Sequence, residues 1–186
     1  MFFIPGTMFF IPGAIISIFT FPGVIVHELA HQLFCYWRRV PVYEVKYFQV
    51  KMSGPCGYVV YERSENPTTI FIISVGPFIV NTLLGACILI PASIMDMFGQ
   101  NPQFTPLIIW LGISVLMHAF PSIGDAQVII STILKNKEIN IVIRILAAPI
   151  VGLIYLGSIG SVIWLDLGYA LLIWYYLLPK LIPLIL

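Results

Sequence analysis

Charged side chains are scarce in this sequence. Lys and Arg number 9 and Asp and Glu number 8, which is 9% of the 186 residues, whereas hydrophobic residues make up 60%. A soluble domain carries roughly 25% charged residues because its surface faces water. The composition therefore excludes an ordinary soluble globular protein and indicates that lipid surrounds most of the chain. We expect the lipid bilayer as its solvent and no nucleic-acid partner.

Cysteine is rare as well, and its spacing excludes a second class of protein. Cys35, Cys56 and Cys87 form no CxxC pair, so a disulfide framework has no support and we interpret them as small packing residues. A basic stretch followed by an A-x-A-like cleavage site is also absent at the amino end, which argues against a secretory signal. The repeated "MFFIPG" instead predicts an irregular or re-entrant lead-in over 1–13, because its prolines and glycines oppose a continuous helix.

Long apolar runs, by contrast, are abundant. Each is long enough for the ~20 residues that a helix needs to cross the hydrocarbon core. The runs cover 7–36, 69–95, 104–124, 139–165 and 167–186. The sequence therefore predicts an all-α polytopic membrane protein with about five transmembrane helices, folded as a single membrane-embedded domain over 1–186.

Basic residues fall on alternate connections between these runs. Five of them lie between the first and second runs, and Lys135 and Lys137 lie between the third and fourth. The other two connections carry only Asp96 and Asp166. Because Lys and Arg concentrate on cytoplasmic loops, this pattern predicts a multi-pass protein with its amino end outside and its carboxyl end in the cytoplasm.

The connection between the first two runs has a different composition. "PVYEVKYFQV" and "GYVVYE" are rich in Val and Tyr, and the turn-forming "KMSGPCG" separates them. This pattern predicts a small β-hairpin over 41–62 on the cytoplasmic side.

The most specific signal is "HELAH" near the end of the first run. On a helix, His27 and His31 lie one turn apart on the same face, so both imidazoles can point at one metal ion. Glu28 lies on the same side and can reach a water molecule at the metal without binding the metal itself. This H-E-x-x-H pattern is typical of two zinc ligands and a general base. The alternative is a set of core polar residues held by interhelical hydrogen bonds.

A catalytic zinc site needs a third protein ligand and an open position. The candidates on another span are His118 and Asp125. Asp125 is expected at the same membrane depth as the histidines, on a segment broken by "PSIGD", which lets the chain turn a carboxylate inward. His118 lies about two turns further out. We therefore favour Asp125 as the third ligand and expect His118 to be a neighbour.

Together these elements resemble the site-2 protease family of intramembrane zinc metalloproteases. That family completes H-E-x-x-H with an Asp in a pattern similar to N-x-x-P-x-x-x-x-D-G. Here "HAFPSIGDA" keeps Pro121, but His118 stands where Asn is expected, the interval to Asp125 is one residue shorter, and Ala126 follows the Asp. The resemblance covers 24–125, with core helices at about 7–36, 69–95 and 104–124, and the runs 139–165 and 167–186 as accessory scaffold.

A second element resembles the family's central helix, which often carries Gly-Pro followed by Asn. "VGPFIVN" contains Gly76, Pro77 and Asn81 with one extra residue before the Asn. The resemblance makes Asn81 and His118 candidate hydrogen-bond donors to the transition state or substrate. Asn81 has an equal alternative as an interhelical hydrogen-bonding residue.

The resemblance implies a zinc metalloendopeptidase that binds one Zn²⁺ per chain through His27, His31 and Asp125, with Glu28 as the catalytic base. Its substrate would be a membrane-anchored protein cut near the cytoplasmic side. An extended substrate segment can add to the edge of the 41–62 hairpin. Two other functions remain open: a metal-ion transporter, and a catalytically inactive relative that serves as a membrane binding scaffold.

Overall fold

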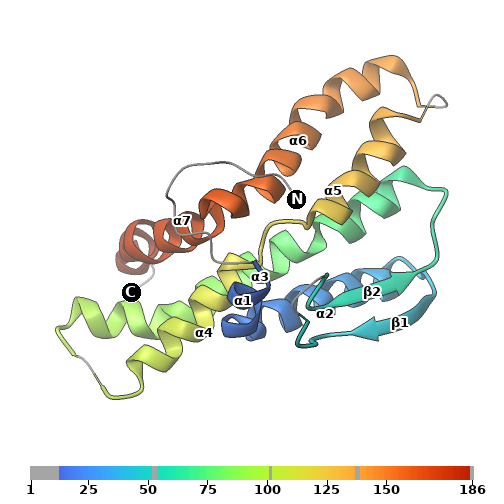
Figure 1. The fold of residues 1–186 in the computed structure, drawn as a ribbon. Coiled ribbons are helices and arrows are strands. Elements are labelled where there is room, and N and C mark those ends of the chain that lie inside the picture. Colours follow the sequence, from blue (N-terminus) through green and yellow to red (C-terminus); the bar gives the residue numbers. More distant parts are fainter. Residues whose placement is uncertain (1–12, 52–53, 101, 137–138, 185–186) are drawn as a thin grey trace, which may run out of the picture.

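The computed structural model describes residues 13–51, 54–100, 102–136 and 139–184 (Figure 1). The irregular lead-in expected over 1–13 therefore lies outside the described residues, apart from Gly13. The described chain is mostly helical, and its strands form one two-stranded sheet.

The longest element is α3, Pro67–Met97, which runs through the middle of the molecule (Figure 1). Its start is fixed by Asn66, whose side chain accepts hydrogen bonds from the backbone N–H groups of Thr68 and Thr69. Its end is marked by Gly99, whose φ of 65° is a left-handed conformation that glycine adopts without strain. At 1.5 Å per residue, its 31 residues extend about 46 Å, more than the hydrocarbon core requires.

Three shorter segments pack along α3. The first is a bent pair, α1 (Gly13–Phe19) and α2 (Phe21–Trp37), whose axes differ by 92°. The second is α4 (Thr105–Met117). The third is α5 (Ile123–Ile129), which a π-helical segment, η1 (Ile130–Leu134), extends. The expected span 104–124 therefore ends early: α4 stops at Met117, the chain passes Pro121 without helix, and only the first two residues of α5 lie in that interval.

The carboxyl-terminal part is a chain of helical segments with one sharp break. α6 covers Ile141–Gly160, a short 3₁₀ segment (η2) covers Ser161–Ile163, and α7 covers Leu165–Leu172. A π-helical segment (η3, Ile173–Leu177), α8 (Leu178–Leu181) and a final 3₁₀ segment (η4, Ile182–Leu184) complete the described residues. The break is at Trp164, whose φ is 62°.

These carboxyl-terminal helices follow α3 in the same direction along its length. Phe71 of α3 packs on the buried cluster that contains Val151 of α6. Further along α3, Thr82 is hydrogen-bonded to Tyr169 of α7 at 2.8 Å. Near its end, Asp96 shares a cavity with Tyr175. α6 and α7 thus both run in the same direction as α3. From the sequence we expected the fourth and fifth spans to be antiparallel to each other.

Three helical stretches are long and apolar enough to cross a membrane: Pro67–Met97, Ile141–Gly160 and Leu165–Leu184. A fourth is counted if the bent pair α1 and α2 is one span, while α4 and Ile123–Leu134 are shorter apolar helices. The described residues therefore have the character of a membrane protein, but the expected count of five spans is not confirmed. The prediction of the side of the membrane on which each chain end lies depended on that count, so it is not supported either.

The predicted hairpin is present in the expected interval. β1 (Val42–Lys46) pairs antiparallel with β2 (Tyr58–Tyr61), and the register aligns Val45 with Val59 and Lys46 with Tyr58. An irregularity between Val42 and Glu44 bends the first strand. Both strands contact α2, so the sheet lies beside the helix that carries the H-E-x-x-H pattern (Figure 1).

Candidate metal centre

α2 presents His27 and His31 toward the interior of the molecule. Both side chains are buried, although histidine is a polar residue and most of α2 is apolar. α2 approaches α4 closely at Gly23, where an added Cβ would lie 1.9 Å from the backbone oxygen of Ser114. The absence of a side chain at Gly23 therefore lets the two helices touch one turn before the first histidine.

The Nδ1 atom of each imidazole is bonded to a backbone carbonyl. His27 Nδ1 lies 2.7 Å from the carbonyl oxygen of His118, and His31 Nδ1 lies 3.0 Å from that of Ile73. A carbonyl oxygen only accepts, so Nδ1 is the protonated nitrogen in both rings. In the neutral imidazoles, Nε2 then carries a free lone pair, which is the form that binds metals.

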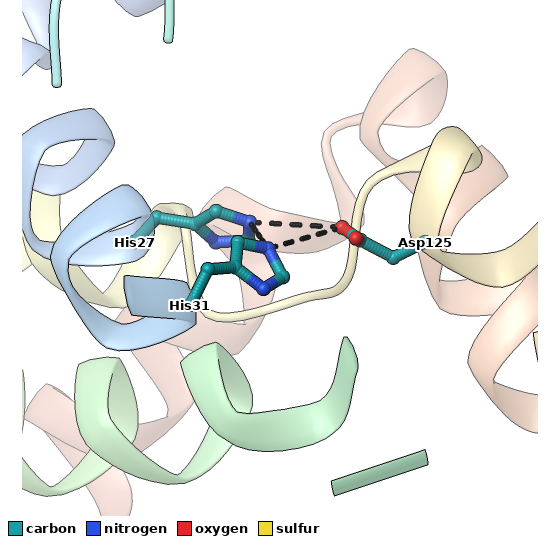
Figure 2. Close-up of side chains that lie close together, drawn as sticks. All are labelled: His27, His31 and Asp125. Atoms are coloured by element: carbon teal, nitrogen blue, oxygen red, sulfur yellow. Dashed lines mark hydrogen bonds and ion pairs between the residues drawn. The ribbon is translucent and has the colours of Figure 1, made fainter. Parts of the chain in front are cut away.

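The two Nε2 atoms converge on the carboxylate of Asp125 (Figure 2). They lie 3.2 Å from each other. Asp125 Oδ2 lies 3.4 Å from His31 Nε2 and 3.8 Å from His27 Nε2. Two lone pairs and a carboxylate oxygen thus face one another with no hydrogen between them in this tautomer. Such a group of acceptors is stable only with a cation, either a proton or a metal ion, among them.

The spacing of these three atoms fits a zinc ion. Bonds of roughly 2.0–2.1 Å to nitrogen and oxygen in tetrahedral geometry separate neighbouring ligand atoms by about 3.3–3.4 Å. The measured separations of 3.2, 3.4 and 3.8 Å bracket that value. Two imidazoles and one carboxylate are also a donor set that zinc prefers, and they leave a fourth position open.

Asp125 is held in place by the start of α5. Its Oδ2 accepts hydrogen bonds from the backbone N–H of Ser122 at 2.9 Å and from the Ser122 hydroxyl at 2.6 Å. In return, the Ser122 oxygen accepts from the Asp125 N–H, which completes a capping box. The break between α4 and α5 therefore turns this carboxylate toward α2, as the sequence predicted.

Glu28 is the next residue along α2 after His27 and is also buried. It is outside the three-atom group but close enough to His27 and Asp125 to interact with both electrostatically. The β1–β2 connection packs directly on it, since a Cβ added at Gly57 would lie 2.7 Å from Glu28 Cγ. The Glu28 side chain thus lies beside the three candidate ligands and against the connection that leads into β2.

Tyr61 of β2 is a neighbour of the site that the sequence did not reveal. Burial, together with the negative charge of Asp125, raises the pKa of Tyr61 to about 12. The phenol therefore stays protonated at neutral pH and keeps a hydrogen to donate. Nothing in the alternating pattern of the hairpin distinguishes this tyrosine from the others.

His118 lies beside the centre but is outside the group of three converging side chains. Its Nε2 is 2.8 Å from the Thr20 hydroxyl at the bend between α1 and α2. That hydroxyl already donates to the carbonyl of Ile16, so the imidazole donates to it. Only the backbone carbonyl of His118 takes part in the site, as the acceptor for His27.

Asn81 of α3 joins three helices behind the ligands. Its amide nitrogen lies 3.3 Å from the carbonyl oxygen of Gly23, 3.2 Å from that of Val115 and 3.0 Å from that of His118. The last of these carbonyls also accepts from His27. These bonds favour the interhelical role for Asn81, because its donor is directed at backbone oxygens. A transition-state contact for Asn81 or His118 stays a prediction.

Comparison with models of protein families, with curated proteins and with solved structures finds no significant match to this chain. The resemblance to site-2 proteases therefore depends on the motifs and on the geometry described above.

Proposed function

We propose that this chain is an intramembrane zinc metalloprotease of the site-2 protease type. The observation that carries the proposal is the convergence of His27 Nε2, His31 Nε2 and Asp125 Oδ2, with Glu28 beside them. When bound, zinc supplies water activation and polarisation of the scissile carbonyl. One ion per chain would be held by these three side chains, whose supporting hydrogen bonds come from Ser122 and two backbone carbonyls.

Glu28 is the proposed general base and acid. Its carboxylate takes a proton from the attacking water as the oxygen adds to the carbonyl carbon. It returns that proton to the amide nitrogen as the carbon–nitrogen bond breaks, which releases a free amine and a carboxylic acid. Burial beneath Gly57 keeps bulk water from competing for this proton.

The proposed substrate is a membrane-anchored protein cut near the cytoplasmic side. Ile73, which anchors His31, lies about two turns from the start of α3, so the centre is close to the hairpin end of that helix. We assign this end to the cytoplasm because it carries Arg38, Arg39 and Lys46. On this assignment the end of α3 at Asp96, and Tyr175 beside it, face the opposite side.

The hairpin is the proposed clamp for the substrate. A helical segment in lipid hides its amides in its own hydrogen bonds, so it must unwind before cleavage. The described sheet has only two strands, which leaves an outer edge on each for an extended peptide. Replacing Val60 of β2 with proline is expected to lower cleavage at least several-fold while zinc content is unchanged. Full cleavage by that variant would contradict the clamp.

The test of the proposed function is cleavage in proteoliposomes. Purified protein is mixed with a panel of single-span reporters, and the products are located by mass spectrometry. We expect cuts near the hairpin side, loss of cleavage with a zinc chelator, and recovery with Zn²⁺ but not with Mg²⁺. Zinc flux across the same vesicles without cleavage would instead identify a transporter. Among the described residues only one group of three clustered ligands occurs, whereas an ion path requires several.

A further inference from the structure

A cavity of about 150 Å³ lies at the far end of α3 from the metal centre. It is partly open and lies between the last turns of α3, the start of α4 and the segment that follows α7, and its lining includes Asp96, Thr105, Trp174 and Tyr175. In Figure 1 the end of α3 lies on the side of the molecule away from the hairpin. Ile73 and Asp96 are 23 positions apart on α3, or about 34 Å. The cavity is therefore separate from the proposed active site.

The Asp96 side chain is exposed, and its carboxylate lies at the carboxyl end of α3. It lies in the last turn of α3, where the helix dipole places partial negative charge and disfavours an anion. Within the described residues it forms no salt bridge. Lys180, on α8, directs its ammonium to the ring of Tyr176, 3.7 Å from the centroid. The carboxylate and the helix end thus both attract a positive charge that the described chain does not supply.

Two aromatic rings line the same cavity. The rings of Trp174 and Tyr175 have centroids 4.3 Å apart and an interplanar angle of 30°. The face of an indole or phenol ring attracts cations, and aromatic rings beside a carboxylate are a recurring way to bind alkylated ammonium groups. At about 150 Å³, the cavity is large enough for one small organic group.

We propose that this cavity binds the ammonium group of a small organic cation of the choline or ethanolamine type. Asp96 supplies the counter-charge, and Trp174 and Tyr175 supply the apolar and aromatic walls. Such a group reaches the site either as a free cation or as the headgroup of a membrane lipid. The proposal does not depend on protease activity, because none of these residues touches the metal centre.

The test is equilibrium dialysis of the purified, detergent-solubilised chain against radiolabelled choline, with ionic strength held constant by NaCl. We expect saturable binding of one choline per chain. Asp96→Asn should weaken the affinity roughly tenfold or more, because a charged partner is lost. Trp174→Leu should weaken it roughly 2- to 30-fold, with partial rescue in Trp174→Phe. Asp166→Asn is the matched control, since Asp166 is an acid in the first turn of α7, lies outside the lining of the cavity and should leave binding unchanged.

Competition separates the two sources of the ammonium group. If nanodiscs that contain phosphatidylcholine or phosphatidylethanolamine displace choline and phosphatidylglycerol nanodiscs do not, the ligand is a lipid headgroup. If neither displaces it, the ligand is a soluble cation. Three results would overturn the proposal. They are a lack of saturable binding, an unchanged choline affinity in Asp96→Asn, and displacement of choline by K⁺ at the same concentration. Equal size-exclusion profiles of the variants exclude misfolding as the cause of a lost signal.

Discussion

Replacing Glu28 with Gln is expected to reduce cleavage of a membrane-anchored substrate by roughly 10²–10⁴-fold. The amide keeps the size of the carboxylate and its packing below Gly57, but it cannot take a proton from water. Zinc content should stay near that of the wild type, because Glu28 is outside the group of three ligand atoms. The measurement is the initial rate of reporter cleavage in proteoliposomes, alongside metal analysis of the same samples.

The matched control for Glu28→Gln is Glu65→Gln, an exposed acid that precedes α3. It removes the same charge from the same end of the molecule and should retain full activity. Wild-type rates in Glu28→Gln would contradict the assigned base. Loss of both zinc and activity in Glu28→Gln would show that this carboxylate holds the metal site together and is not a separate proton carrier.

Replacing Asp125 with Asn is expected to weaken zinc binding by at least about 100-fold, since one of three protein ligands loses its charge. Replacing His118 with Ala should change the affinity only a few-fold. The His118 ring bonds to Thr20, and the backbone carbonyl that supports His27 remains in the alanine variant. The affinities are measured by competition with a chromophoric zinc chelator at fixed pH.

These two variants distinguish the candidates for the third ligand that the sequence left open. If zinc is retained in Asp125→Asn and lost in His118→Ala, the metal is not held by the three side chains drawn in Figure 2. Asp125→Glu offers a further comparison. It keeps the charge but lengthens the side chain, so the capping box with Ser122 would be disturbed and affinity should fall between the wild type and Asp125→Asn.

The parts of the site that the sequence could predict are local. One helical turn separates His27 from His31, so their common face follows from helix geometry alone. The segment "PSIGD" contains both the helix break and the S-x-x-D capping pattern that orients Asp125. The strands of the hairpin follow from the Val and Tyr content between two apolar runs, and the structure has them in the expected interval.

The long-range features could not be predicted, and each has a physical reason. The sequence of an apolar run indicates how long its helix is but not in which direction the helix runs. We therefore predicted α6 and α7 as two antiparallel spans, although both run along α3 in the same direction. The 92° bend at Thr20 divides a hydrophobic run with no charge at the bend itself, and Pro22 and Gly23, which follow the bend, indicate a helix start but not its angle. The acceptors for His27 and His31 are backbone carbonyls, which every residue has, so no sequence signal identifies His118 or Ile73 for this role.

The most direct test of the proposed metal centre is the zinc content of the purified chain in detergent, compared with that of His31→Ala. Inductively coupled plasma mass spectrometry and quantitative amino-acid analysis of the same samples give the ratio of metal to protein. We expect close to one zinc per wild-type chain and much less in His31→Ala. A wild-type chain that binds no zinc even after reconstitution, or a variant that binds as much as the wild type, would contradict it.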